Sequence, residues 1–128
     1  MTGFVTRAAA LLAVPLLLVG CSGGGSGKDT GSVTTTGAAD AQTATVDMGA
    51  DLKFRPSTVL ARVGTVTLTA NNTGQVPHDL VFDDKALGKT GTVDGKTSEP
   101  LKVTFSKAGT FTFTCTFHSG MAGKVVVS

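Results

Sequence analysis

The chain has 128 residues, of which 11 are basic and 9 are acidic, and its formal net charge is +2 at pH 7. That length accommodates one small domain, which excludes two-domain architectures. Charge is not concentrated in blocks, and the chain has no Trp or Tyr, so nucleic acid is not expected as a partner.

Residues 1–20 have the pattern of an export signal. Arg7 is their only charged residue, and it precedes the apolar run from Ala8 to Val19. A run of about twelve residues, at about 1.5 Å each, is too short for a hydrocarbon core about 30 Å thick. We therefore predict a cleavable signal peptide over residues 1–20 rather than a permanent transmembrane helix.

The run ends in Leu18-Val19-Gly20-Cys21, which resembles the lipobox of bacterial lipoproteins. This resemblance implies that the bond before Cys21 is cut and that the Cys21 thiol carries diacylglycerol. The protein would then be anchored on the extracytoplasmic side of a bacterial membrane. The alternative is an ordinary signal peptide that happens to end at a cysteine. If Cys21 is lipidated, Cys115 is a lone thiol in an oxidising compartment, where it is either reactive or ligated.

After Cys21, residues 22–42 consist mainly of Gly, Ser, Thr and Ala, with Val33 as the only large apolar side chain. Such a stretch buries too little surface to offset its ordering entropy. We predict that residues 21–42 form the lipidated cysteine and a flexible linker, and that the folded domain spans residues 43–128.

From residue 43 the apolar side chains recur with a period of two, which is typical of strands with one buried face. Turn signals such as Asn71-Asn72-Thr73-Gly74 and Asp94-Gly95 separate the runs. We predict an all-β sandwich or small barrel of about seven or eight strands, with one helical turn over residues 84–87.

The alternation also predicts where the candidate metal-binding side chains lie. His78 shares a strand face with Leu80 and Phe82, and Cys115 shares one with Phe113, so both should point inward. His78 lies at the start of its predicted strand, and Cys115 lies at the end of its own. If these strands are antiparallel neighbours, the two side chains meet at one end of the sandwich.

His118 and Met121 follow Cys115 at three-residue intervals. A thiolate and a thioether are soft donors, and two imidazoles with one thiolate and a distant axial Met form the blue-copper arrangement. Each of these residues alone has an ordinary structural explanation; together, at this spacing, they indicate a metal site. Zinc is disfavoured because no fourth Cys, His or carboxylate ligand is evident. With both histidines committed to the metal, none remains for a Ser-His-Asp set or for a catalytic copper, and an enzyme is not expected.

Residues 115–127 resemble the C-terminal ligand loop of cupredoxins, with the C-x-x-H-x-x-M spacing of the amicyanin branch, and residues 77–83 resemble the upstream ligand segment of plastocyanins and amicyanins. The resemblance implies a Greek-key β-sandwich. It also implies one type 1 copper ion, with His78, Cys115, His118 and Met121 as ligands.

Two residues depart from that family pattern. Asp79 stands where the family usually has Asn, a residue that ties the two ligand segments together. Asp79 could do so only as an acceptor, for example from Thr116. Phe117 stands where the amicyanin branch has Pro. Unlike Pro, Phe117 has a backbone N–H.

The leading hypothesis is an electron carrier that cycles between Cu(II) and Cu(I). The apolar residues expected around His118 suit brief docking with redox proteins, and a monomer is expected. These docking residues are Val76, Pro77, Phe117 and Gly120. A copper storage or delivery protein is the alternative, although Met48 alone does not make the Met- or His-rich runs expected of one. A copper-free adhesive sandwich is the third possibility.

Overall fold

The structure, a computed structural model, describes residues 30–128. The predicted signal peptide and Cys21 therefore lie outside the described residues. The described part contains strands, loops and a single 3-10 helix, η1 (Lys85–Leu87), and none of its helical segments has the length and apolarity to cross a membrane.

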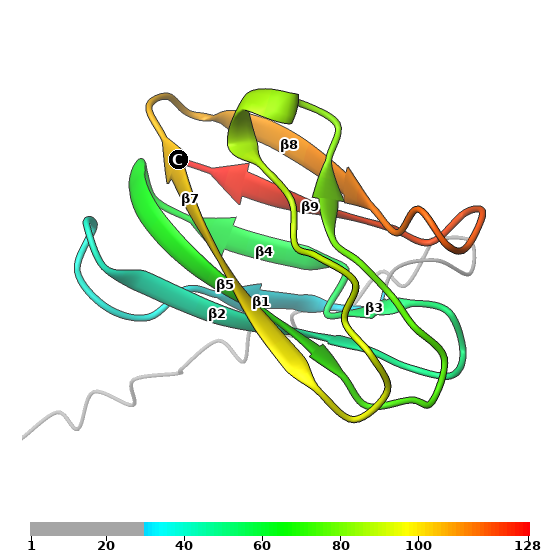
Figure 1. Ribbon diagram of the computed structural model, residues 1–128. Helices are drawn as coiled ribbons and strands as arrows, with labels where there is room; N and C mark the ends of the chain where they lie inside the picture. The colour runs from blue at the N-terminus through cyan, green and yellow to red at the C-terminus, as the bar shows by residue number, and fades with distance from the viewer. Residues whose placement is uncertain (1–29) are drawn as a thin grey trace, which may run out of the picture.

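Residues 30–128 form nine strands in two sheets that pack face to face (Figure 1). The sandwich confirms the all-β prediction, with one or two strands more than expected. The first sheet has the order β1 (Ser32–Thr34), β4 (Thr58–Ala61), β9 (Ala122–Val127), β8 (Gly109–Thr114), β6 (Val81–Phe82). The second has the order β3 (Phe54–Arg55), β2 (Gln42–Met48), β5 (Gly64–Asn72), β7 (Ser98–Phe105).

The core lies between the two sheets and is rich in phenylalanine. The ring of Phe113 packs edge-on against Phe54 and Phe82, with centroids 4.9 and 5.7 Å apart, and Phe82 also contacts Phe105 at 6.1 Å. All four rings are buried. Burial of one such side chain stabilises the fold by about 1.5–3 kcal/mol, and edge-to-face packing adds to this. The Phe-rich strand β8 is thereby fixed, and Cys115 follows it directly.

The folded domain begins earlier than predicted. Residues 22–42 were expected to be a flexible linker, but β1 pairs in parallel with β4, with Ser32 opposite Thr58 and Thr34 opposite Leu60. The composition argument fails here because an edge strand gains its backbone hydrogen bonds from a neighbour that is already ordered. Val33 then needs only to pack against the existing core.

A buried glutamine closes this added segment against the sandwich. Gln42 Oε1 accepts hydrogen bonds from Thr35 Oγ1 (2.8 Å) and the Arg62 backbone N–H (2.9 Å), and Gln42 Nε2 donates to the carbonyls of Ala39 (3.0 Å) and Arg62 (2.8 Å). Because all its polar atoms are paired, the buried amide carries no desolvation penalty of an unpaired group.

The predicted helical turn is present as η1. Asp84 caps it, since Asp84 Oδ1 accepts a hydrogen bond from the Ala86 backbone N–H at 3.0 Å.

Candidate metal centre

His78 lies in the connection between β5 and β6 and is completely buried, as the strand alternation predicts. Its backbone N–H donates to the Val93 carbonyl (3.1 Å) and its carbonyl accepts from the Val93 N–H (2.8 Å). The buried amide of Asn72 donates to the carbonyls of Val76 (2.8 Å) and Val93 (2.9 Å). Asn72 therefore fixes the loop that carries His78.

Cys115 directly follows β8 and is 5% exposed. The loop after it turns back on itself, because the Cys115 N–H donates to the Met121 carbonyl (3.0 Å) and the Met121 N–H donates to the His118 carbonyl (3.3 Å). Gly120 has φ +79 in this turn, a conformation that favours glycine. The antiparallel pairing of β6 with β8 brings the loop to His78, as predicted.

Three donor atoms converge where these segments meet. The Cys115 Sγ lies 3.7 Å from His78 Nδ1 and 3.5 Å from His118 Nδ1, and the three donors all lie within 4.8 Å of one another. Donors bound at about 2.0–2.3 Å to one tetrahedral ion lie about 3.5 Å apart. The three side chains therefore have the separation that ligands of one small metal ion require.

Burial holds the His78 imidazole in its neutral, ligating form. The pKa of His78 is lowered mainly by burial and further by the neighbouring His118 ring, whose centroid is 4.7 Å away. The Gly49 backbone and the Asp79 carboxyl group partly oppose this, although His78 Nε2 itself makes no hydrogen bond. A buried neutral imidazole with Nδ1 facing a sulfur atom is suited to metal ligation.

Burial also raises the pKa of the Cys115 thiol, whereas the backbone of Asp79 and of Phe117 lowers it through hydrogen bonding. The negative charge of Asp79 raises that pKa further. At neutral pH the thiol is therefore protonated unless a cation is bound beside it. A metal ion is the kind of charge that deprotonates a coordinating thiol.

Asp79 and Thr116 tie the two ligand segments together, as predicted. Asp79 Oδ1 accepts a hydrogen bond from the Thr116 backbone N–H at 2.6 Å, and Asp79 Oδ2 accepts from Thr116 Oγ1. Asp79 is 8% exposed whereas Thr116 is exposed, so the two contacts are partly buried. They link the residue after His78 to the residue after Cys115 and so limit relative motion of the two donors.

Met121 is buried and lies next to Cys115 through the backbone hydrogen bond described above. Met121 lines a groove of about 380 Å3 that also includes Leu52, Phe54 and Gly120. Its place in the loop is that of the predicted axial ligand, and that role remains a prediction.

His118 is half-buried and is surrounded by exposed apolar side chains. Phe117 is 48% exposed, with its ring centroid 6.5 Å from that of His118, and Val76 and Pro77 are exposed on the His78 side. The exposed Leu52 lines the neighbouring groove and was not predicted. Its only sequence signal is a large apolar residue between Asp51 and Lys53 in a turn.

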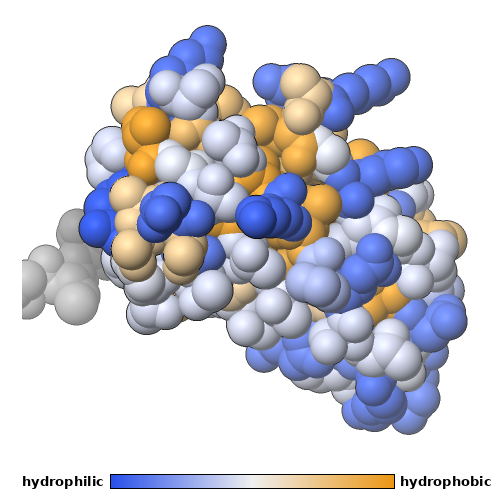
Figure 2. Space-filling model, turned by 60° about the vertical axis from the view of Figure 1, so that its left-hand side comes forward, coloured by the Kyte–Doolittle hydropathy of each residue, from blue (hydrophilic) through white to orange (hydrophobic). Residues whose placement is uncertain are grey.

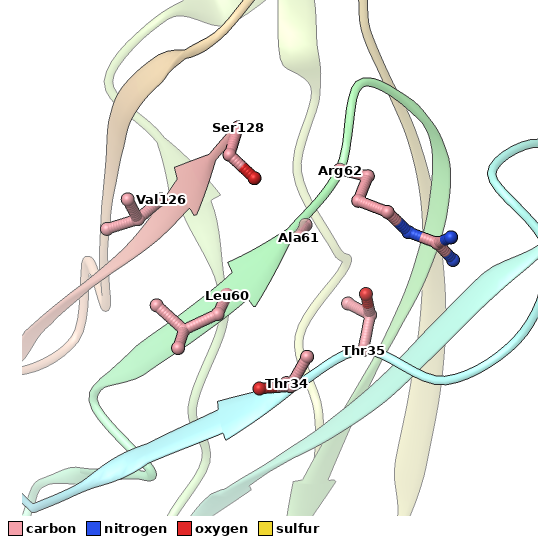
Figure 3. A pocket seen from close by; sticks show the side chains of 7 residues that line it. All are labelled: Thr34, Thr35, Leu60, Ala61, Arg62, Val126 and Ser128. Atoms are coloured by element: carbon pink, nitrogen blue, oxygen red, sulfur yellow. The ribbon is translucent and has the colours of Figure 1, made fainter.

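Another groove, of about 290 Å3, lies at the opposite end of the first sheet (Figure 3). Its charged side chain, Arg62, donates a hydrogen bond to the Gly37 carbonyl. None of its seven lining residues is His, Cys, Asp or Glu, so this groove lacks metal-binding donors. The residues that line this groove are Thr34, Thr35, Leu60, Ala61, Arg62, Val126 and Ser128.

Comparison with known proteins gives the class to which this fold and donor set belong. Residues 10–127 match the family described as a cupredoxin-like domain. The chain belongs to the cupredoxin-like family, as its ligand loop suggested.

Among characterised relatives, a chloroplastic plastocyanin from Tetradesmus obliquus is 34% identical over 103 residues, covering 70% of this chain and 70% of that protein. Amicyanin from Paracoccus denitrificans is 34% identical over 80 residues, covering 61% of this chain and 60% of that protein.

Solved structures agree with this placement. A mutant of amicyanin in its reduced Cu(I) form is 32% identical, with a TM-score of 0.54, over 66% of this chain and 80% of that one. Auracyanin A from Chloroflexus aurantiacus, described as a "blue" copper protein, has a TM-score of 0.61 at 19% identity, over 69% of this chain and 99% of that one. At that identity the likeness concerns the fold alone.

Proposed function

We propose that this protein is a one-electron carrier that holds one type 1 copper ion on His78, Cys115, His118 and Met121. The observation that carries the proposal is the convergence of three donor atoms, one thiol and two imidazole nitrogens, within 4.8 Å. When bound, copper supplies a centre that alternates between Cu(II) and Cu(I). Soft sulfur donors suit the reduced ion and imidazoles suit both.

The protein contributes a rigid and enclosed site. His78, Cys115 and Met121 are buried, and His118 is half-buried, so water has little access to the ligands. The backbone hydrogen bonds of the ligand loop and the link between Asp79 and Thr116 hold the donors in place. A fixed donor set changes little between oxidation states and leaves no open position for a substrate. This favours a carrier over an enzyme.

Electron exchange requires brief contact with a partner, and the surface around His118 suits it. Phe117, Val76, Pro77 and Leu52 offer exposed apolar area around the half-buried imidazole. Small interfaces, below about 1,200 Å2, are typical of transient redox complexes. We propose that the protein acts as a monomer that docks through this surface, with Gly120 at its edge.

We further propose that a lipid on Cys21 anchors the protein to the extracytoplasmic face of a bacterial membrane. The Leu18-Val19-Gly20-Cys21 pattern supports this, as does the apolar run before it. Mass spectrometry of the mature protein tests this proposal. The expected result is a chain that begins at Cys21 and carries a diacylglyceryl group on the Cys21 thiol.

Voltammetry of the copper-loaded protein tests the carrier function. The expected result is one reversible one-electron wave, because the ligand set serves both oxidation states. The matched control is Cys115→Ser, which removes the thiolate and should abolish the wave. Copper that binds but cannot be cycled reversibly would contradict the proposal and favour storage or delivery.

A further inference from the structure

The position at which the chain enters the domain is fixed by β1. This strand runs parallel to β4, and β4 runs parallel to β9, so that Ser32 lies opposite Thr58 and Thr58 lies opposite Lys124. Strand β9 begins at Ala122, immediately after Met121. The start of β1 therefore lies at the end of the sandwich that carries the ligand loop (Figure 1). We call this end, formed by residues 72–78 and 115–121, the metal end.

Hydrogen bonds place Thr30 beside the ligand loop. The Thr30 backbone N–H donates to Ser57 Oγ at 3.1 Å, and Thr30 Oγ1 donates to the Phe54 carbonyl. Phe54 lines the same groove as Gly120 and Met121. The residues that precede Thr30 are therefore joined to the domain next to the metal end.

The opposite, far end of the sandwich carries the C-terminus. Val127 of β9 pairs with Gly109, and the Ser128 carbonyl accepts a hydrogen bond from the Val63 N–H at 3.1 Å. Strand β5 runs from this end, at Gly64, to the metal end, at Asn72. Nine extended residues span about 30 Å, which is the approximate distance between the two ends.

The sequence limits how far the metal end can be from Cys21. Eight residues, 22–29, separate Cys21 from Thr30, and six of them are Gly or Ser. Their fully extended length is at most about 30 Å, and a Gly/Ser-rich segment of that length has a root-mean-square span of about 17 Å. A lipid on Cys21 thus keeps the metal end close to the bilayer, whereas the far end can lie about 30 Å farther out.

The chemistry of the two ends supports the same orientation. Neither residues 72–78 nor residues 115–123 include an Asp, Glu, Lys or Arg. Of the five large hydrophobic side chains exposed in residues 30–128, Val76 and Phe117 lie at the metal end, and Leu52 lines the groove beside it. Figure 2, which brings the far end forward, shows hydrophilic side chains over much of that face with apolar ones between them. The charged side chains beside this end are Lys96, which donates a hydrogen bond to the Thr73 carbonyl, and Asp51 and Lys53, which line the groove next to Gly120. Acidic charge does not predominate among them, so an anionic membrane surface does not repel this end.

From this geometry we propose that the metal end faces the membrane and that the electron-exchange partner is a membrane-bound redox protein rather than a freely diffusing carrier. This proposal rests on the proposed function and on lipidation of Cys21. One electron passes between the partner's redox centre and the copper held by this chain, so that one is oxidised as the other is reduced, with no bond formed or broken. The short connection confines the site to the layer next to the membrane in which anchored partners lie, which raises the frequency of their encounters.

Fluorescence energy transfer to the bilayer tests the orientation without requiring electron transfer. The mature lipidated protein is placed in vesicles with an acceptor-labelled lipid, in its reduced form so that the copper does not absorb. A donor dye is attached through an azide-bearing amino acid at Gln75 or, separately, at Lys107 next to the turn before β8. Both positions are exposed.

The Gln75 donor, at the metal end, should transfer energy more efficiently than the Lys107 donor. In the matched control, Cys21→Ser removes the native anchor and a lipid is attached after Ser128 through an eight-residue Gly/Ser spacer. The order of the two efficiencies should then reverse. Equal or reversed efficiencies with the native anchor, or a mature protein that does not bind vesicles, would overturn the proposal.

A second measurement addresses the partner class. Vesicles that contain a lipid with a ferrocene headgroup provide a membrane-bound redox probe, and soluble ferrocene carboxylate provides the reference. The protein anchored at Cys21 should exchange electrons with the lipid probe at least about tenfold faster than the protein anchored after Ser128. Both should react equally with the soluble probe. Equal rates with the lipid probe would contradict the proposal, whereas failure with both probes would contradict the carrier function itself.

Discussion

The carboxylate of Asp79 is expected to lower the reduction potential of the bound copper. It is nearly buried and accepts two hydrogen bonds from Thr116, next to the thiol ligand. Its negative charge raises the pKa of Cys115, and for the same electrostatic reason it favours the more positive oxidation state. The substitution Asp79→Asn removes this charge. The amide oxygen still accepts from the Thr116 N–H, and the amide nitrogen donates to Thr116 Oγ1.

The size of the effect follows from Coulomb's law. For an assumed separation of about 7 Å between the Asp79 carboxylate and the metal, and an effective dielectric constant of about 20, a unit charge interacts with a unit change in metal charge by about 2.4 kcal/mol. Because about 1.4 kcal/mol corresponds to about 59 mV for a one-electron couple, Asp79→Asn should raise the potential by about 100 mV. Solvent screening reduces this value, since the site lies near the surface.

A redox titration at pH 7 measures the shift. The control is Thr116→Val, which keeps the Asp79 charge but removes the hydroxyl donor. It should change the potential much less than Asp79→Asn and should lower the free energy of unfolding by about 1.5–3 kcal/mol, the value of a hydrogen bond to a charged group. An unchanged or lowered potential in Asp79→Asn would refute the electrostatic reasoning.

Three further predictions follow from the site. Because the axial bond is weak, Met121→Leu should still bind copper and should raise the reduction potential, whereas Met121→Gln should lower it. Redox titration measures both shifts. Loss of copper binding in Met121→Leu would exclude the axial role. Copper at about a thousandfold above its dissociation constant should stabilise the fold by about 4 kcal/mol, which calorimetry would detect as a melting temperature roughly 15–30 °C above that of the copper-free protein. Asn72→Ala should destabilise the fold by about 2–3 kcal/mol in urea titrations, since the Val76 and Val93 carbonyls lose their amide donor.

Sequence patterns predicted the placement of the ligands because that placement depends on local rules. Strand alternation turned His78 and Cys115 inward, and the three-residue spacing put His118 in the loop that follows. The link from Asp79 to Thr116 was expected from the resemblance to cupredoxins, in which an Asn at that position ties the two ligand segments together.

Features that depend on contacts between distant segments were not predictable. Strand β1 has the composition of a linker, and only its pairing with β4 makes it ordered. Asn72 belongs to a turn signal in the sequence, but its function depends on a carbonyl 21 residues away, at Val93. Leu52 lies beside the metal end only because β2 and β3 bring its turn against the ligand loop.

The most direct test of the copper centre is the visible absorption spectrum of the copper-free protein after addition of one equivalent of Cu(II). Cys115, with its sulfur facing the Nδ1 atoms of His78 and His118, predicts an intense blue colour that saturates at one copper per chain. The same addition to Cys115→Ser should give no blue colour, since a hydroxyl group cannot replace the thiolate. A colourless wild-type protein, or a blue Cys115→Ser variant, would contradict the account.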